Sequence, residues 1–345
     1  MSIGLDLTTL NFSSLRPGEG QLAGRGCRAC FVAVEKSPLH RHLLDQMQLT
    51  YAECDNHLLV WGDHASSFSK IFHAQSPCLP LLPQGQLPEN QPPVRQMLAY
   101  LIEGLLPKSE GNGELCGVAF PRSHESLRQS TTDFLTQLIN LNGYRVAEIS
   151  PSRAMALAEF AACEYTGIAL HIGASVSDMC VMNHGRVLWQ QSVELSACLP
   201  ASLWGEFQAS LVSPRSEGPI GRAGRNDGSR HEKFGMDSTG RPTEFATDVI
   251  MRCRVLQQVM ERHFTGLTSA SIFHSGSRPV PLLLGGECPR GSAVAQGMQQ
   301  DMAALGGPLP IGDVRWPMFG EQSVARGCLI HAELESQANG STRAA

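Results

Sequence analysis

Two closely spaced cysteines are the first residues whose types and spacing could do chemistry. Cys27 and Cys30 have the C-x-x-C spacing of half a zinc site or of a redox pair. Tetrahedral coordination needs further ligands, but neither the other cysteines nor the twelve histidines form a second C-x-x-C or an HExxH pattern. Eleven cysteines scattered along a large chain are typical of free thiols in a reducing compartment. We therefore expect Cys27 and Cys30 to be thiols that flank the start of a strand.

Polar residues also follow apolar strands at two places far apart in the chain. Asp6 and Thr8 come directly after the apolar start of the chain, and His171 and Ser175 lie at the end of the apolar stretch 168–172. The common nucleotide motifs GxGxxG and GxxxxGK[ST] do not occur at these turns. From its neighbouring residues alone, Asp6 can also be interpreted as a strand-end carboxylate that caps a turn. His171 is by the same reasoning a strand residue that donates to a neighbouring carbonyl.

Length and composition define the kind of chain that must position these residues. The 345 residues are enough for two domains, and 42% hydrophobic with 17% charged residues is typical of a folded chain. The net charge of -5 argues against a strongly basic nucleic-acid binder. No apolar run reaches the length of a membrane span, and the first residues lack a signal-peptide pattern. We expect a cytoplasmic protein with no nucleic-acid partner and no direct membrane anchor.

The predicted elements form two similar series. Strands at 2–7, 11–15 and 30–34 open the chain as a meander, and a second meander is expected at 168–172, 178–183 and 186–195. Further elements are expected as strands at 58–61, 115–120, 145–149 and 280–284 and as helices at 64–73, 94–106, 127–141, 152–164, 243–264, 292–305 and 321–334. Because each meander passes into helices, we predict a duplicated α/β architecture with a cleft between its halves.

Three segments are predicted to be irregular. The proline-rich stretch 77–93 is expected to be a surface connection, and the polar tail after residue 334 is expected to be frayed. Residues 213–241 are rich in Gly, Ser and Arg and are expected to form a mobile loop. That loop is either a solvated insertion or a contact for a phosphate or an acidic partner.

Five segments in a fixed order resemble the motifs of the actin-like ATPase superfamily, which includes actin, the bacterial filament protein MreB and the nucleotide-binding domain of DnaK-type chaperones. These segments are IGLDLTTLN at 3–11, LCGVAFP at 115–121 with EISPSRAMA at 148–156, IALHIGASVSD at 168–178, PLLLGG at 281–286 and SVARG at 323–327. Together they span nearly the whole chain. WGDHA at 61–65 and PQGQ at 83–86 make the layout most similar to the bacterial MreB- or DnaK-like members.

The resemblance implies a two-lobed, ribonuclease H-like duplicated α/β fold with a nucleotide cleft between the lobes. Lobe I would span 1–165 with a small inserted subdomain at about 35–95, and lobe II would span 166–320. Residues 321–345 would form a C-terminal helix that packs back on lobe I, followed by the polar tail.

The resemblance also implies ATP or ADP with Mg²⁺ as the ligand of the cleft. The positions that match the family's nucleotide-binding motifs are Asp6, Thr8, Thr9 and Asn11 in the first turn, Gly173, Ala174, Ser175 and Ser177 in the second, and Gly285, Gly286 and Glu287 in the adenosine motif. Asp6 would hold the metal through water. Phosphate would be held less tightly than in the family, because several glycines of the two turns are replaced.

Two departures concern hydrolysis. Ser150 stands where the family has its catalytic glutamate, and His171 stands where it has a metal-holding aspartate. Serine is a poor base at its normal pKa, and an imidazole binds Mg²⁺ weakly compared with a carboxylate. Glu148 precedes Ser150 by two residues and would share its face of a continuing strand.

The missing carboxylates favour a degenerate, pseudo-ATPase member that works as a scaffold or a protein-binding module and is capable of self-association. The alternative is an active, filament-forming ATPase with relocated acids, for which Glu148, Asp178 and Glu287 are the candidates. A sugar or acetate kinase of the same superfamily is a third possibility, but its motifs do not occur in the sequence.

Overall fold

The computed structural model describes residues 2–8, 10–65, 68, 78–89, 91–109, 111, 113–121, 125–173, 175–195, 258–263, 265, 279–286 and 311–343. The expected loop 213–241 and helix 292–305 lie outside these ranges, as do most of the expected helices 64–73 and 243–264. Within the ranges, no helix is both long and apolar enough to cross a membrane.

The first lobe is built on a five-stranded sheet with the order β3-β2-β1-β8-β9. Its strands are β1 (Ile3–Asp6), β2 (Asn11–Pro17), β3 (Leu22–Arg28), β8 (Leu115–Ala119) and β9 (Arg145–Glu148). β1 pairs antiparallel with β2 and parallel with β8. Every residue of β1 and β8 is buried, because elements cover both faces of the parallel part of the sheet.

The third strand of this meander is not the one that the sequence predicted. β3 (Leu22–Arg28) takes that place and pairs with β2 from Asn11↔Arg28 to Pro17↔Leu22. The predicted strand, β4 (Cys30–Glu35), belongs to a different sheet. β3 lies at the sheet edge and none of its residues is buried, so it lacks the apolar alternation from which a strand is inferred.

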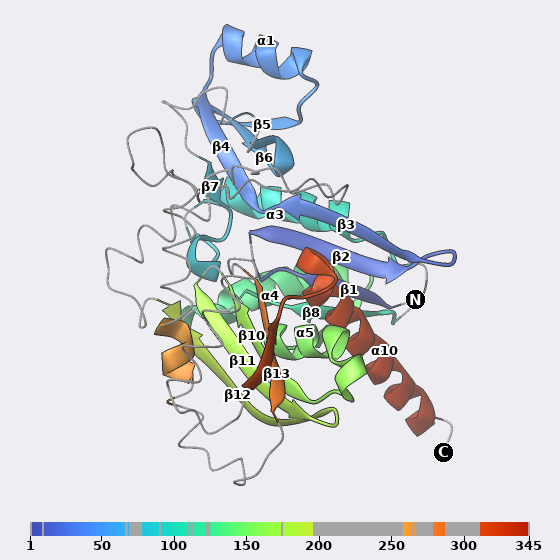
Figure 1. The fold of residues 1–345 in the computed structure, drawn as a ribbon. Coiled ribbons are helices and arrows are strands. Elements are labelled where there is room, and N and C mark those ends of the chain that lie inside the picture. Colours follow the sequence, from blue (N-terminus) through green and yellow to red (C-terminus); the bar gives the residue numbers. More distant parts are fainter. Residues whose placement is uncertain are drawn as a thin grey trace, which may run out of the picture.

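The second lobe repeats the same design. Its sheet has the order β12-β11-β10-β13-β14, which is again an antiparallel meander followed by two parallel strands. These strands are β10 (Gly167–Ile172), β11 (Val176–Asn183), β12 (Arg186–Glu194), β13 (Val280–Gly286) and β14 (Ile311–Arg315). The predicted duplication and the second meander are confirmed, whereas β14 had no counterpart among the predicted elements. Figure 1 shows the two sheets one above the other.

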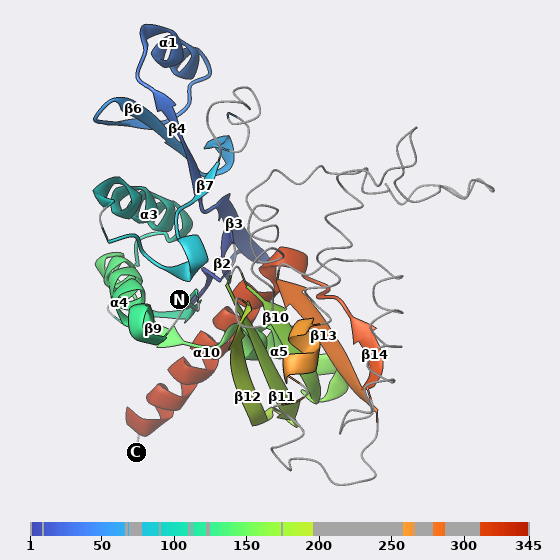
Figure 2. The same ribbon diagram turned by 90° about the vertical axis from the view of Figure 1, so that its left-hand side faces the viewer.

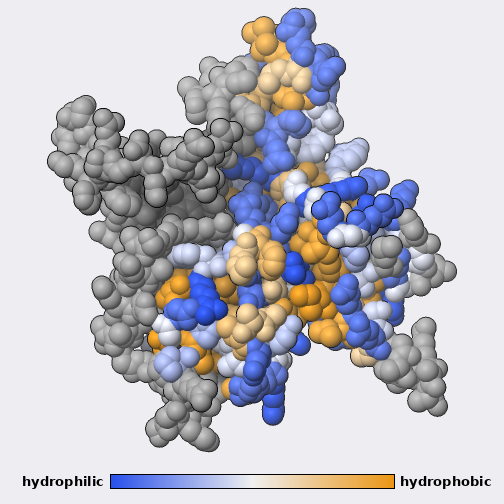
Figure 3. Space-filling view, turned by 45° about the vertical axis from the view of Figure 1, so that its right-hand side comes forward, coloured by the Kyte–Doolittle hydropathy of each residue, from blue (hydrophilic) through white to orange (hydrophobic). Residues whose placement is uncertain are grey.

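A third, smaller sheet carries the part of the chain that extends away from the two lobes (Figure 2). Its order is β5-β6-β4-β7, with β4 (Cys30–Glu35), β5 (Tyr51–Cys54), β6 (His57–Trp61) and β7 (Leu79–Pro80). Helix α1 (Pro38–Gln46) lies at its tip and begins at Ser37, whose hydroxyl accepts a hydrogen bond from the His40 amide. Exposed Leu39 and Met47 give this tip a mixed polar and apolar surface (Figure 3).

The prediction that 77–93 is only a surface connection was wrong. Leu81, Leu82 and Leu87 are buried in the core of the first lobe, and the Leu81 amide donates to the Ala29 carbonyl at 2.9 Å. Prolines interrupt regular structure in this segment, but burial of its leucines still removes apolar surface from water and stabilises the fold. The segment therefore packs as part of the lobe.

Helices cover the sheets of both lobes. They are α3 (Pro92–Leu105), α4 (Glu125–Leu141), α5 (Pro151–Glu159) and α10 (Ser323–Arg343), with short 3₁₀ turns at Pro83–Gly85, Ala161–Cys163 and Gly320–Gln322. The expected helix 152–164 ends at Glu159, and left-handed Glu164 and Tyr165 then lead the chain into β10. α3, α4 and the start of α10 lie close to their predicted positions.

Helix α10 packs on the sheet of the first lobe and on α5. Figure 1 shows it in red, running from the middle of the molecule to the C-terminus. It packs against β1, β8 and α5, and glycines allow the close approach. A Cβ at Gly4 or Gly117 would overlap backbone oxygens of α10, and a Cβ at Gly327 would overlap the Ala154 carbonyl of α5. The helix also continues to Arg343, past the predicted end at 334.

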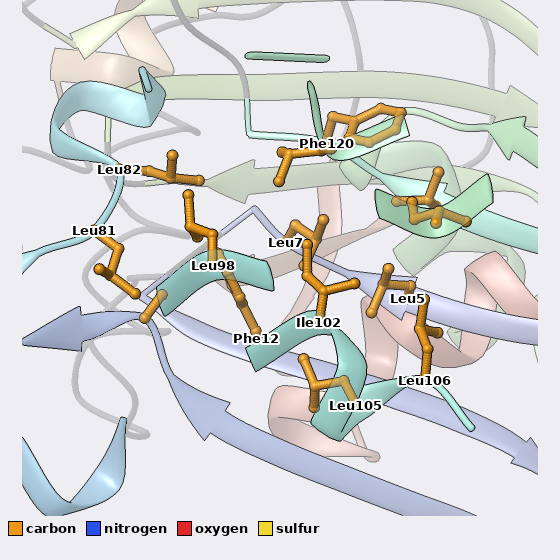
Figure 4. Packing of buried hydrophobic residues seen from close by; sticks show 14 of the residues in the cluster. Leu5, Leu7, Phe12, Leu81, Leu82, Leu98, Ile102, Leu105, Leu106 and Phe120 are labelled. Atoms are coloured by element: carbon orange, nitrogen blue, oxygen red, sulfur yellow. The ribbon is translucent and has the colours of Figure 1, made fainter. Parts of the chain in front are cut away.

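The core of the first lobe lies between its sheet and α3. In Figure 4 the side chains of Leu98, Ile102 and Leu105 on α3 face those of Leu5 and Phe12 on β1 and β2. Apolar residues at helical spacing on α3 meet the buried strands, so burial of apolar surface holds this helix in place.

Candidate functional site

The two lobes meet at a small hollow between the β1–β2 turn and the β10–β11 turn, called the interlobe hollow below. It is lined by Leu7, Thr8, Leu10, Phe12, Ala29, Leu82, Gly85, Pro121, Pro151, His171, Gly173, Ser175, Val176 and Asp178. Its volume is about 20 Å³, which is room for roughly one or two water molecules. The lobes are therefore closed on each other at the place where the sequence predicted a ligand.

Asp6 and Thr8 form a closed turn at the end of β1. The Asp6 carboxylate is 2% exposed and accepts from the Thr8 amide at 2.9 Å and from the Thr8 hydroxyl at 2.6 Å. A carboxylate that accepts from the backbone two residues ahead forms an Asx turn. Asp6 therefore caps the turn, as its position at the end of a strand predicted, and its carboxylate also orients the Thr8 hydroxyl.

His171 of the second lobe completes a chain of hydrogen bonds across the hollow. Its Nε2 atom lies 3.2 Å from the Thr8 hydroxyl oxygen. The single hydroxyl proton of Thr8 is directed to Asp6, so the oxygen accepts from His171 and Nε2 carries a proton. Burial lowers the pKa of His171 to about 4, against the opposing effect of the Asp178 carboxylate. The ring is therefore neutral at physiological pH, and it donates to Thr8 of the opposite lobe.

Asp178 stands beside His171 and holds the start of helix α5. The two residues are directly paired across β10 and β11, and Asp178 is 1% exposed. Its carboxylate accepts from the Ser152 amide at 3.1 Å, the Ser152 hydroxyl at 2.5 Å and the Ser192 hydroxyl at 2.6 Å. A carboxylate at a helix N-terminus satisfies free amides and interacts favourably with the helix dipole.

Ser150 and Glu148 do not share a face, contrary to the sequence-based expectation. β9 ends at Glu148, which is exposed, and Ser150 is the buried residue before α5. The chain changes from strand to helix between them, so strand alternation no longer applies. The Ser150 hydroxyl is buried without a hydrogen-bond partner and adjoins Pro151, which lines the hollow.

The second predicted turn divides its residues between two faces of the sheet. The Ser175 hydroxyl lies at the hollow and donates to the Gln84 carbonyl of the other lobe at 2.8 Å. Ser177 points to the opposite face, where its hydroxyl donates to the Val193 carbonyl at 3.2 Å and lies 2.8 Å from His263 Nε2. Ser177 lies in β11 between Val176 and Asp178, which line the hollow, so strand alternation turns it to the other face, whereas Ser175 precedes the strand.

Glycine gives a close contact at one point where the turns touch. A Cβ on Gly173 would lie 3.0 Å from the Val176 carbonyl oxygen and 3.2 Å from that of Thr8, tighter than an ordinary contact. Gly285 and Gly286 instead close the end of β13 against Met155 and Ile172. Both therefore allow close packing between β13, β10 and α5, and Gly285 is paired directly with His171 of the hollow.

The remaining predicted site residues are either absent from the lining of the hollow or outside the described residues. Asn11 starts β2 and is half-buried. Thr9, Ala174 and Glu287 lie outside the described residues. Sequence reasoning missed Gln84, Ser152 and Ser192, because each acts through a partner that is distant in the chain. No local pattern marks such residues.

The described residues do not fit a Mg²⁺ site in this arrangement. They contain no group of three His, Cys, Asp or Glu side chains placed to hold a metal ion. Asp6 already accepts two hydrogen bonds, and the neutral His171 donates to Thr8 rather than offering Nε2 as a ligand. A nucleotide likewise exceeds the volume of the hollow.

Two matching five-stranded sheets, whose hairpin turns meet at the hollow, define a two-lobed protein of the actin-like fold. The structure is similar to that of the MamK double helical filament, at a TM-score of 0.57 and 14% identity, covering 96% of this chain and 98% of the other. It is also similar to MreB5 of Spiroplasma citri bound to AMPPNP, at a TM-score of 0.52 and 14% identity, covering 99% and 97%. The ADP-bound form of MreB5 gives 0.51 at 14% identity, covering 98% and 96%.

The family of the chain follows from its sequence. The Volactin family matches residues 1–195, more than half of the chain, and the protein belongs to this family. No curated protein sequence matches it. The predicted actin-like fold and its similarity to MreB-type proteins are confirmed.

Proposed function

We propose that this protein is an actin-like scaffold that hydrolyses ATP slowly or not at all and that acts through self-association and through a protein partner in the cytoplasm. The observation that carries the proposal is the buried hydrogen-bond chain from Asp6 through Thr8 to the neutral His171. The resemblance to the actin-like superfamily implies two carboxylates and a hydrated metal ion at this place.

The chemistry of hydrolysis explains why this arrangement matters. Attack on the terminal phosphate needs an oriented water and a metal ion that neutralises the developing charge. A neutral imidazole supplies no negative charge for Mg²⁺, and the Ser150 hydroxyl does not act as a base at neutral pH. Removal of one key side chain commonly costs a factor of about 10²–10³ in rate, and effects within one cooperating unit are not additive.

Nucleotide binding without turnover is part of the proposal. The similar structures include MreB5 bound to AMPPNP and to ADP and a filament of MamK, which supports a nucleotide-dependent, self-associating protein. Binding requires that the lobes separate, because the hollow now holds about 20 Å³. The contacts that must open are Thr8 to His171 and Ser175 to Gln84.

The test is calorimetric titration of the full chain with ATP and with ADP in the presence of Mg²⁺, followed by phosphate release from the same samples. We expect binding with little or no release. No binding at millimolar nucleotide would reduce the proposal to a scaffold that works without nucleotide. Sedimentation with and without ATP then measures self-association, since a polymer pellets and a monomer does not.

An active enzyme with relocated acids predicts a different result. Asp178 is the candidate that lines the hollow, although three donors already occupy its oxygens. Sustained release that is lost in Asp6→Ala but kept in Ser150→Ala would overturn the proposal in favour of this enzyme.

A further inference from the structure

The outermost strand of the first lobe has an open edge. β3 (Leu22–Arg28) is the terminal strand of the order β3-β2-β1-β8-β9, and no described strand pairs with its outer side. Its first five residues are all exposed, which for Gly24 and Gly26 means that the backbone itself is exposed, because glycine has no side chain. Figure 1 shows the β2–β3 hairpin extending from the molecule near the N-terminus. β3 therefore offers backbone groups to a partner.

The hairpin turn determines which residues of β3 direct their backbone groups outward. The Gly18 amide donates to the Gln21 carbonyl at 2.9 Å, so these two residues form a hydrogen-bonded pair. Hydrogen-bonded and non-hydrogen-bonded pairs alternate along an antiparallel ladder. From the register of β2 and β3 it follows that Leu22, Gly24 and Gly26 direct their N–H and C=O groups away from β2.

The far end of the strand agrees with this alternation. The Ala29 amide donates to the Leu10 carbonyl at 2.7 Å, as the alternation requires of an inward group. The Arg28 amide points outward and donates to the Asp63 carboxylate at 3.1 Å. The three outward residues before it have no such backbone partner in the described part of the chain. Their amides and carbonyls are therefore available for hydrogen bonds to an added strand.

β3 lacks most of the features that protect an edge strand from further pairing. Its ladder with β2 runs without a bulge over seven residues, and the strand contains neither proline nor lysine. Its exposed charge is that of Arg25. An edge of this length with free backbone groups is a template for strand addition by an extended peptide.

The charge around the edge favours an acidic occupant. Residues 16–28 contain three arginines and one glutamate, whereas the whole chain carries -5. The Arg25 guanidinium donates to the Gly104 carbonyl at 2.8 Å, and neither it nor the exposed Arg16 forms an ion pair with a described residue. Arg25 pairs with Ser14, so it shares a face with Arg16. A residue added opposite Arg25 would have its Cβ about 5 Å away, which suits aspartate or glutamate.

A second copy of the chain fits this edge poorly. Antiparallel pairing of two β3 strands about their middle residue would place Arg25 directly opposite Arg25, and like charges at such positions are destabilising. The other face of the strand has room for a large side chain. A Cβ on Gly26 would lie 3.6 Å from the Phe12 carbonyl oxygen, with no closer atom. The occupant is therefore a different protein, with acidic residues that alternate with larger ones.

We propose that β3 is the docking edge for an extended acidic segment of a partner protein, which adds to the sheet of the first lobe as a further strand. Its backbone pairs with the outward groups of Leu22, Gly24 and Gly26, its acidic side chains face Arg25, and the side chains between them lie over the glycines. The inference rests on the proposed function for the existence of a protein partner, and it names the surface and the chemistry of that partner.

The test is titration of the full chain with a short acetylated peptide of alternating valine and glutamate, at low salt and without nucleotide. We expect binding, with slower amide exchange at Leu22, Gly24 and Gly26 of the wild type. Gly26→Pro removes one outward amide and should weaken binding about tenfold or more. Gly26→Ala keeps that amide and is the matched control, since its Cβ fits without a clash. Arg25→Ala should weaken binding about threefold and reduce its salt dependence.

Three results would overturn the proposal. One is the absence of binding, or binding without slower exchange in 22–26, and both are measured on the wild type and so do not depend on the folding of a variant. Another is equal binding of a peptide with proline in place of each valine, which keeps the charge but is a poor strand and would indicate charge attraction alone. The third is loss of self-association in Gly26→Pro, which would assign the edge to a second copy.

Failure of this inference is distinguishable from failure of the proposed function. Nucleotide binding, phosphate release and sedimentation of the wild type are measured without the peptide. A chain that binds nucleotide without turnover and self-associates, but does not bind the acidic peptide, would keep the proposed function and lose only the docking edge.

Discussion

Acidification is expected to destabilise the folded protein through two buried histidines of the second lobe. His171 is 1% and His263 is 0% exposed. Burial lowers the pKa of each from 6.5 to about 4, and the Asp178 carboxylate opposes this in both cases. The unfolded chain takes up a proton at each histidine near pH 6.5, whereas the folded chain does not do so until about pH 4.

The sign and size of the effect follow from this difference. Stability is fully present above pH 6.5 and is lost as the pH falls from 6.5 towards 4, because the unfolded state binds more protons there. At pH 5 each histidine costs about 2 kcal/mol relative to pH 8, and below pH 4 about 3 kcal/mol. Two such losses are a large part of a typical unfolding free energy of about 5–15 kcal/mol.

The assay is guanidinium unfolding of the wild type and of His171→Gln at several pH values between 8 and 5. Glutamine does not titrate, and its amide can still donate to Thr8. We expect the difference in unfolding free energy between the two proteins to shift by about 2 kcal/mol in favour of the variant on going from pH 8 to pH 5. His42→Gln on the exposed face of α1 is the control and should show no such shift.

A constant difference between wild type and His171→Gln across this pH range would refute the reasoning. It would mean that His171 is accessible to water or protonated in the folded state. The hydrogen-bond chain from Asp6 through Thr8 to His171 would then not exist in the form described, and the argument against Mg²⁺ at this position would fail with it.

Three further substitutions test the packing and polar contacts around the hollow. Gly327→Ala places a Cβ onto the Ala154 carbonyl and should cost about 3 kcal/mol or more in thermal unfolding, since backbone on both sides must move. Asp178→Asn removes the charge that accepts two hydrogen bonds from Ser152 at the start of α5 and one from Ser192 of β12, and it should cost about 3 kcal/mol, measured by chemical unfolding. Ser175→Ala removes the bond to the Gln84 carbonyl and should cost about 1 kcal/mol, with faster amide exchange in 81–87; unchanged exchange there would contradict a closing role.

The duplicated architecture was predictable because it depends on local patterns. Apolar runs mark β1, β8, β10 and β13, and helical spacing marks α3, so burial of these faces determines which elements form. The order of strands and helices in each half then limits the topology. Four strands of each five-stranded sheet follow from this information, whereas the edge strands β3 and β14 do not.

Two parts of the fold were not predictable from local patterns. β3 is held by backbone pairing at a sheet edge, and its residues carry no apolar alternation. The prolines of 77–93 suggested a surface connection, although Leu81 and Leu82 reach the core. In both cases the neighbouring residues indicated no strand or core segment, because the residues that stabilise it lie elsewhere in the chain.

The sequence by itself determined the residue types at the two turns, the absence of two expected carboxylates and the repeated strand order, since each of these is a property of neighbouring residues. Only the tertiary structure decided what those residues do. It joined Thr8 to His171, placed Asp178 at the start of α5, turned Ser177 away from the hollow and separated Cys27 from Cys30 into different clusters. The physical reason is that hydrogen bonds and burial act between atoms brought together by folding, across separations that no local pattern records.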